Sequence, residues 1–452
     1  MRRLNRFFKL TPLAALCVTL PALATNGYFS HGYGMKAKGM GGAATATASD
    51  SFGGAVNPAA MVFAGERLDV GLDVFSPRRS ASRQGSTGFG GGYDGYADSD
   101  SNYFFVPEFG YNKVVNSKLT LGVSVYGNGG MNTNYDSKSA NPSFAPSCQG
   151  APSNLLFGCG RLGVDLMQLI IAPTASYKIS EAHSIGISPL LGYQRFKVEG
   201  LQAFDETLNM GFGPFTFTSS QGNTTNRGYD GATGFGVRVG WMGKISDTVT
   251  LGAAYSSKIR MDKFEKYKGL FAEQGGFDIP ENYNFGIAVK AMPTLMVAFD
   301  VQQINYSKVA SIANGVANTL LSLPPVAPNR LGDANGSGFN WRDQTVYKLG
   351  AEYEYAKGVV LRGGFNYGRS PIRDGDMADI SFNIIAPGVV EKHLTLGATW
   401  TLASKAELTF SYMHAFTKSV TGPSATALLG VGGTETLKMS QNALGIAYGV
   451  KF

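Results

Sequence analysis

Most of the chain beyond about Phe63 alternates between apolar residues and small or polar ones. The segment 119–126 reads LTLGVSVY, and the segments 249–256 and 295–302 alternate in the same way. Because successive side chains of a β-strand point to opposite faces of the sheet, each segment would have one apolar and one polar face. An α-helix would need apolar residues spaced by about 3.6 positions, which these segments lack. The pattern predicts an all-β fold.

Tight turns and long polar loops alternate between these segments. The tight turns lie at 115–118, 246–248, 291–294, 356–358 and 403–405, and the longer stretches lie near 80–100, 131–163, 204–228, 264–279, 309–340, 371–388 and 419–435. Bacterial outer-membrane barrels have short periplasmic turns and longer extracellular loops. The spacing therefore predicts a transmembrane antiparallel β-barrel of about 14 strands, an even number within the range of such barrels.

The last nine residues, LGIAYGVKF, show the cleanest alternation. Every even position from Leu444 to Phe452 is apolar or aromatic, and every odd position is Gly, Ala or Lys. An aromatic residue at the end of an amphipathic strand resembles the signal by which outer-membrane proteins are delivered to their assembly machinery. We therefore expect this segment to be the last strand of the barrel.

The first residues have the layout of a secretory signal. Four basic residues precede an apolar stretch, 10–20, which is followed by Ala22-Leu23-Ala24. The stretch is too short to span a membrane, and small residues at these two positions suit a signal peptidase. We expect residues 1–24 to be removed and the mature chain to begin near Thr25, in a protein bound for the bacterial outer membrane.

Charge and composition narrow the class of protein. Without the four basic residues of the signal, 35 basic residues face 32 acidic ones, a net charge of +3. So small a charge on so long a chain gives no footprint for nucleic acid. Charged residues make up 16% of the chain, below the roughly 25% of soluble domains. After the signal no stretch of about 20 apolar residues occurs, which excludes helical membrane spans. A secreted soluble β-protein remains an alternative, although the long alternating segments fit it less well.

Residues 25–62 differ from the rest because they are rich in Gly, Ala, Ser and Thr and show little alternation. Small residues allow the backbone to pack closely in a confined space. Asn57-Pro58-Ala59 indicates a rigid turn, since Asn can cap a turn while Pro fixes the next φ. We expect a hatch that plugs the lumen of a barrel formed by residues 63–452; the alternative is a disordered tail.

Two cysteines remain after the signal, Cys148 and Cys159. An even pair in an oxidising compartment, closing a short loop, favours a disulfide over two free thiols. The segment supplies too few ligands for a metal site, and no cofactor is expected.

Residues 32–61, GYGMKAKGMGGAATATASDSFGGAVNPAAM, resemble the N-terminal hatch of the long-chain fatty acid and aromatic hydrocarbon transporter family of the outer membrane (FadL/TodX-like, OMPP1 family). The segment Phe339–Ile372, which ends in Ser370-Pro371, and the segment 392–416 extend the resemblance, as does the terminal Phe452. The order and spacing agree over nearly the whole mature chain, although the long loops match only in patches.

The resemblance implies a 14-stranded barrel that acts as a passive channel for hydrophobic small molecules such as long-chain fatty acids. The ligand would be caught among extracellular loops, would move to a site beside the hatch, and would leave through the barrel wall at a kink in the third strand. We expect a monomer whose partners are this ligand and the lipid and lipopolysaccharide of the outer membrane.

Two features are candidates for these roles. Gly127-Asn128-Gly129-Gly130 follows the alternating part of the third strand, and glycines there favour a kink, unless the segment only begins a loop. Apolar side chains on two loops would capture the ligand, if they are not simply loop packing. These side chains are Phe212, Phe215, Phe217, Leu270, Phe271 and Phe277.

Arg195, Lys258 and Arg260 are candidate contacts for a carboxylate. Each can equally be a solvated charge of the lumen or rim, because such charges are ordinary in barrels. Without a basic contact, a neutral hydrocarbon or another apolar compound stays open as the cargo.

Two other functions compete with this one. An outer-membrane enzyme would need a nucleophile or carboxylate with a histidine base, and His31, His183, His393 and His414 lie in no recognisable motif of that kind. A general diffusion porin for small hydrophilic solutes would need charged rings around an open channel, which a small-residue plug does not provide.

Overall fold

The computed structural model describes residues 26–86, 92–209, 214–320, 329–375, 379–425 and 432–452. The expected signal segment 1–24 and Thr25 lie outside these ranges, as does Phe212.

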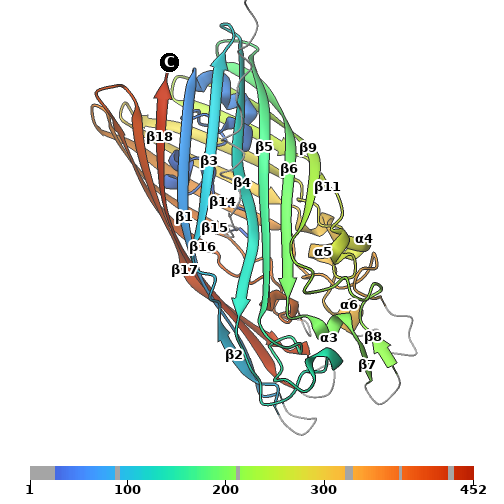
Figure 1. Ribbon diagram of the computed structural model, residues 1–452. Helices are drawn as coiled ribbons and strands as arrows, with labels where there is room; N and C mark the ends of the chain where they lie inside the picture. The colour runs from blue at the N-terminus through green and yellow to red at the C-terminus, as the bar shows by residue number, and fades with distance from the viewer. Residues whose placement is uncertain (1–25, 87–91, 210–213, 321–328, 376–378, 426–431) are drawn as a thin grey trace, which may run out of the picture.

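Fourteen antiparallel strands form a closed ring (Figure 1). In order around the ring they are β1 (Arg67–Gln84), β3 (Phe104–Val114), β4 (Leu119–Tyr135), β5 (Leu162–Lys178), β6 (His183–Glu199), β9 (Asp230–Lys244), β10 (Val249–Ser256), β12 (Asn282–Met292), β13 (Leu295–Ile304), β14 (Gln344–Ala356), β15 (Val359–Gly368), β16 (Lys392–Thr401), β17 (Glu407–Pro423) and β18 (Thr434–Lys451). β18 pairs with β1 and closes the ring. The predicted barrel and its number of strands are confirmed.

The remaining elements are short. β2 (Gly95–Asp98) and β11 (Arg260–Met261) pair with the ends of ring strands, and β7 (Thr207–Asn209) and β8 (Pro214–Thr216) form a hairpin of their own. The helices are α1 (Met35–Gly39), α2 (Met61–Ala64), α3 (Gln202–Asp205), α4 (Ala272–Gly275), α5 (Ala310–Ala313) and α6 (Ala317–Leu320), with 3₁₀ turns at Gly53–Ala55, Pro58–Ala60, Pro146–Cys148, Glu265–Tyr267, Tyr306–Lys308 and Phe382–Ile384. Of the described helices, none combines the length and hydropathy that crossing a bilayer would require.

The two ends of the barrel differ as the turn pattern predicts. Strands are joined at one end by short connections, such as 115–118 and 357–358, and at the other by long loops. The C-terminus lies at the short-turn end, and α3 to α6 gather near the other end (Figure 1). Several strands run further into the expected loops than predicted, since β1 reaches Gln84 and β17 reaches Pro423.

Strand alternation sets the outer and inner faces of the wall. In β18 the side chains of Leu444, Ile446 and Tyr448 are exposed, while Gly445 and Gly449 are buried. In β13 Phe299 faces outward and Asp300 is buried. An apolar outer face beside a polar or small inner face is what a membrane-spanning barrel requires.

Residues 26–64 fill the inside of the ring (blue in Figure 1). Glycines of the wall leave room for them: a Cβ on Gly252 would collide with the backbone of Thr45, and one on Gly364 would collide with the backbone of Met40 and Gly41. The hatch therefore packs backbone against wall, which explains why both partners are rich in small residues.

A pair of neighbouring glycines tests this packing. We expect Gly364→Val to displace the hatch at a cost of about 1–3 kcal/mol, because a side chain there overpacks the lumen. Gly363, whose added Cβ would meet nothing closer than an oxygen at 4.0 Å, gives the control Gly363→Val. The measurements are thermal unfolding and protease cleavage within residues 26–64; equal cleavage of both variants would contradict the close packing.

Candidate functional site

Lys38 of the hatch is tied to two wall strands. Its Nζ lies 3.0 Å from Oδ2 of Asp73 on β1 and 3.2 Å from Oε2 of Glu108 on β3, and all three side chains are buried. Burial alone would lower the pKa of Lys38, but the two carboxylates outweigh it and raise the pKa above its ordinary value. The lysine therefore stays charged and holds α1 against β1 and β3.

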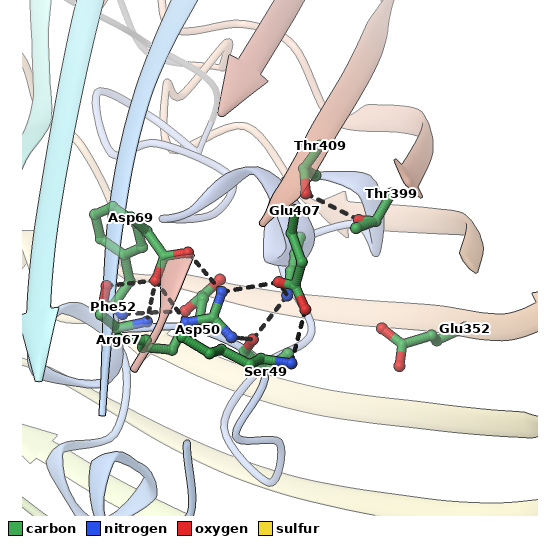
Figure 2. Close-up of polar contacts among 12 residues, drawn as sticks. Ser49, Asp50, Phe52, Arg67, Asp69, Glu352, Thr399, Glu407 and Thr409 are labelled. Carbon is green, nitrogen blue, oxygen red and sulfur yellow. Dashed lines mark hydrogen bonds and ion pairs between the residues drawn. The ribbon is translucent and has the colours of Figure 1, made fainter. Parts of the chain in front are cut away.

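A second polar network anchors the hatch near the short-turn end (Figure 2). Arg67 on β1 holds Asp69 through Nε and Nη2, at 2.8 and 2.6 Å, and its Nη2 also reaches Glu407 on β17 at 3.0 Å. From the hatch, Lys36 contacts the same Glu407 at 2.6 Å, and Ser51 donates to Asp69. Removing one partner of a buried ion pair is strongly destabilising, so the network fixes the position of the hatch.

The turn at Asn57-Pro58-Ala59 lies against β9. The side-chain oxygen of Asn57 accepts a hydrogen bond from the backbone nitrogen of Ala59 at 3.1 Å, and Pro58 begins the 3₁₀ turn. The amide nitrogen of Asn57 donates to the carbonyl oxygens of Thr45 and Trp241. One side chain thus joins the turn, the middle of the hatch and the wall.

The segment Gly127–Gly130 lies within β4, the third strand of the ring, and not at the start of a loop. The register with β5 shifts between Gly127 and Gly129, so that Asn128 is an extra residue whose side chain is buried. There Asn128 accepts a hydrogen bond from the hydroxyl of Tyr33 at 3.0 Å and donates to Gln168 at 2.8 Å. An extra residue of this kind bends a strand.

The wall is incomplete beside this bend. β3 pairs with β4 only from Phe109 to Val114, opposite Val125 to Thr120. The rest of β3, from Phe104, pairs with β1 alone, while β4 continues to Tyr135 paired with β5. Nearer the long-loop end, at the last residue of β4, a β-bridge between Ser99 and Tyr135 joins the two sides of the wall again. The result is a gap in the hydrogen bonding between β3 and β4.

The first described residues of the hatch cover this gap from inside. The backbone nitrogen of Gly130 donates to the oxygen of Tyr28 at 3.1 Å, and that of Ser30 donates to the oxygen of Asn128 at 3.0 Å. A Cβ on Gly129 would collide with the carbonyl of Tyr28, so glycine is required there. The hatch thus supplies partners that β3 does not.

A narrow apolar cavity lies between the strands and the long loops. Its lining includes Met131, Val164 and Phe196 from the strands and Leu156, Leu201, Phe204, Leu270, Phe271, Leu331, Phe339, Phe382 and Ile385 from the loops. We call it the outer cavity.

A second cavity lies beside the start of the hatch and the bend of β4. Its lining includes Gly27, Phe75, Arg79, Gly130, Met131, Asn132, Trp341 and Met439. We call it the inner cavity. Met131 lines both cavities, which are therefore neighbours.

Residues 22–452 match the family model for the outer membrane protein transport protein (OMPP1/FadL/TodX). The chain belongs to this family. The members are outer-membrane channels for hydrophobic compounds, so this chain is a transport protein of the bacterial outer membrane and not an enzyme.

Solved structures of similar fold agree with this membership of the OMPP1/FadL/TodX family. The toluene transporter TodX of P. putida has a TM-score of 0.65 at 18% identity, over 93% of this chain and 99% of that one. The toluene transporter TbuX of Ralstonia pickettii has a TM-score of 0.61 at 19% identity, over 93% of this chain and 99% of that one. A FadL homologue of Pseudomonas aeruginosa has a TM-score of 0.64 at 15% identity, over 94% of this chain and 100% of that one. No curated protein sequence matches the chain significantly.

Of the described loop side chains expected to capture ligand, Phe215, Phe217, Phe271 and Phe277 are buried and Leu270 is half-buried. Leu270 and Phe271 line the outer cavity, but Phe215, Phe217 and Phe277 pack around other aromatic rings and do not line it. The aromatics pack together because the long loops fold over the end of the barrel. The sequence interpretation did not include Phe196, Phe339 and Phe382, which line this cavity.

The three basic residues proposed for a carboxylate line neither cavity. Arg195 lies 3.8 Å from Asp165 and 4.2 Å from the ring of Tyr229. Lys258 pairs with Asp278 at 3.4 Å, and Arg260 is exposed in a separate hollow that includes outward-facing residues of the wall. Their assignment as carboxylate contacts stays a prediction, and it did not follow the alternation of the strand that carries Arg195. Phe196 faces inward, so its neighbour Arg195 faces outward.

Cys148 and Cys159 form a disulfide in the structure, with Cα atoms 5.9 Å apart. The loop that they close carries Leu156, which lines the outer cavity. The cross-link therefore restricts the movement of one part of the cavity wall.

Removing the charge of Lys38 tests how the hatch is held. We expect Lys38→Met to destabilise the docked hatch by about 3–5 kcal/mol, because Asp73 and Glu108 would be buried without a cation. Adding Asp73→Asn and Glu108→Gln to that variant should restore part of the loss. Thermal unfolding and proteolysis of the hatch measure the effect, and a Lys38→Met hatch as protected as that of the wild type would refute it.

Proposed function

We propose that this chain carries hydrophobic small molecules, long-chain fatty acids or similar compounds, passively across the outer membrane. The main support is the series of apolar spaces that runs from the loops to the gap in the wall. The outer cavity lies under the long loops, the inner cavity adjoins it, and Gly130 of the inner cavity lies on the bend beside the gap. The toluene transporters among the solved structures support a hydrophobic cargo.

Capture of a hydrophobic ligand requires only an apolar surface from which water is excluded. Burial of each CH₂ group stabilises a ligand by about 0.8 kcal/mol, so an apolar chain that enters the outer cavity as the loops move is stabilised in proportion to its length. In the side chains that line that cavity, aromatic rings and branched aliphatic groups dominate over polar groups. Loop side chains cover this cavity, so entry requires that the loops move.

Release goes sideways into the membrane. The region between β3 and β4 that lacks hydrogen bonds is covered from the lumen by Tyr28 and Phe29, and a shift of these two residues would connect the inner cavity with the wall gap. An apolar cargo then stays in apolar surroundings and bypasses the polysaccharide of the outer leaflet. No energy input is needed, since use of the cargo inside the cell sets the direction.

The functional division of the chain follows from the same scheme. We propose residues 1–24 as the signal peptide, residues 25–62 as the hatch and residues 63–452 as the barrel. The first barrel strand, β1, begins at Arg67, shortly after α2 ends at Ala64.

Uptake by cells tests the function directly. Cells that lack the gene should lose entry of long-chain fatty acids or of neutral aromatics and alkanes by about tenfold, while entry of small hydrophilic solutes stays unchanged. Labelled compounds of each class measure this. Loss of hydrophilic solutes alone would instead support a general diffusion porin.

A single glycine tests lateral release. A Cβ on Gly127 would lie 3.0 Å from Cγ1 of Val106, across the gap between β4 and β3. We expect Gly127→Leu to fill the gap and lower uptake of a hydrophobic compound by at least about tenfold, as the apolar path narrows. Gly363→Leu on β15 is the control. Normal uptake by a folded Gly127→Leu barrel would exclude this exit.

A further inference from the structure

A hollow on the outside of the barrel lies across β5, β6 and β9, three neighbouring strands of the ring (Figure 1). Its apolar side chains include Ile171 of β5, Leu191 and Tyr193 of β6, and Phe235 of β9, and all four are exposed on the outer face of the wall. Arg260 adds a positive charge to the lining. We call this feature the lipid-side hollow, because it opens toward the membrane and not toward the lumen.

The register of the sheet places Arg260 beside the apolar floor of the lipid-side hollow. Ile171 pairs with Leu191, and Leu191 pairs with Phe235. Phe235 pairs in turn with Arg260 of β11. Directly paired residues of neighbouring strands share one face of a sheet, so Arg260 points outward in line with three lipid-facing side chains.

The lipid-side hollow lies where the bilayer ends on the long-loop side. Tyr193 is ten positions after His183, at which β6 begins beside a short turn. A membrane-crossing strand needs about 9–11 residues. The next two outward-facing positions of β6, Arg195 and Lys197, are charged. This change from apolar to charged side chains marks the outer boundary of the bilayer, where the headgroups of lipids lie.

Arg260 meets no anion of the protein at this boundary. Its side chain is exposed, and within the described ranges it takes part in neither an ion pair nor a hydrogen bond. The carboxylate in the lining belongs to Asp262, and its Oδ2 accepts a hydrogen bond from the hydroxyl of Thr233 at 2.5 Å. A cation on the lipid face of a barrel is unfavourable unless an anion or water reaches it.

The basic neighbours of Arg260 on the same face are matched by carboxylates. Arg195 lies 3.8 Å from Asp165, and Lys197 lies 3.0 Å from Glu199. The guanidinium of Arg260 therefore stands out as a cation with free N–H groups at the edge of an apolar surface.

We propose that the lipid-side hollow binds lipid A, the phosphorylated anchor of lipopolysaccharide, with a phosphate of lipid A on Arg260. The paired N–H groups of a guanidinium match the oxygens of a phosphate. The hollow is three strands wide, about 10 Å at the usual strand spacing, which gives room for more than one acyl chain on Leu191 and Phe235. Lipid A supplies both the phosphate and the acyl chains in the leaflet that adjoins the long loops. This site is separate from the path of the cargo.

Titration of the purified full-length protein with defined lipids gives the first test. Native mass spectrometry in detergent counts the bound molecules of lipid A bisphosphate and of phosphatidylglycerol, a phospholipid with one phosphate. We expect lipid A to bind at least about tenfold more tightly, because it brings more acyl chains to the hollow and a second phosphate. Equal affinity for the two lipids would overturn the assignment to lipid A, and absence of lipid A binding would overturn the site itself.

Variants then locate the bound lipid. Arg260→Gln should weaken binding of lipid A by about tenfold, and Arg260→Lys, which keeps the charge without the planar fork, should weaken it less. Arg78→Gln is the control, because Arg78 is an exposed arginine of β1 that bonds the hydroxyl of Tyr103 at 3.1 Å. Thermal unfolding verifies that each variant is folded. Lipid A binding as tight in folded Arg260→Gln as in the wild type would overturn the inference.

Discussion

The structure depends on one constraint: backbone polar groups that meet lipid must be hydrogen-bonded within the protein. The ring of 14 strands satisfies this almost everywhere, because each strand pairs with a neighbour on both sides. Between β3 and β4 it does not, and there the hatch provides partners through Tyr28 and Ser30. The hatch is therefore part of the wall as well as a plug, and any movement that opens the lumen there also exposes unpaired backbone. Such a movement is favourable only when something else covers the gap.

The wall could be predicted from the sequence because each strand carries its own two-residue alternation. The segments 119–126, 249–256 and 295–302 all lie in strands with the expected faces. The alternation also contains information that the sequence interpretation did not use. In β1 every odd position from Arg67 to Arg83 faces inward, which places Arg79 in the lumen, and the same reasoning turns Arg195 outward.

The cavities could not be predicted in this way. Phe196, Phe271, Phe339 and Phe382 come from different parts of the chain, and three of them lie in loops that have no periodic pattern. Their meeting depends on how the loops pack over the barrel, which local propensity does not determine. The hatch could be predicted in part. Its small residues predicted close packing, but its contacts with Asp73, Glu108 and Glu407 depend on the register of strands far away in the sequence.

The division of the lumen into two layers gives a physical reason for a sideways path. Toward the short-turn end the hatch is held by paired charges, with Lys36, Lys38 and Arg67 against four carboxylates. Toward the loops, Tyr28 and Phe29 of the hatch pack against Tyr306 and Trp341. A hydrophobic molecule that continued straight on would have to separate buried ion pairs, which costs several kcal/mol for each broken pair. Moving the aromatic layer breaks only a few backbone hydrogen bonds and apolar contacts that the molecule itself can replace. The ion pairs of this charged layer thus position the hatch and block the direct route. The route with the lower free-energy cost leads to the gap beside Gly130.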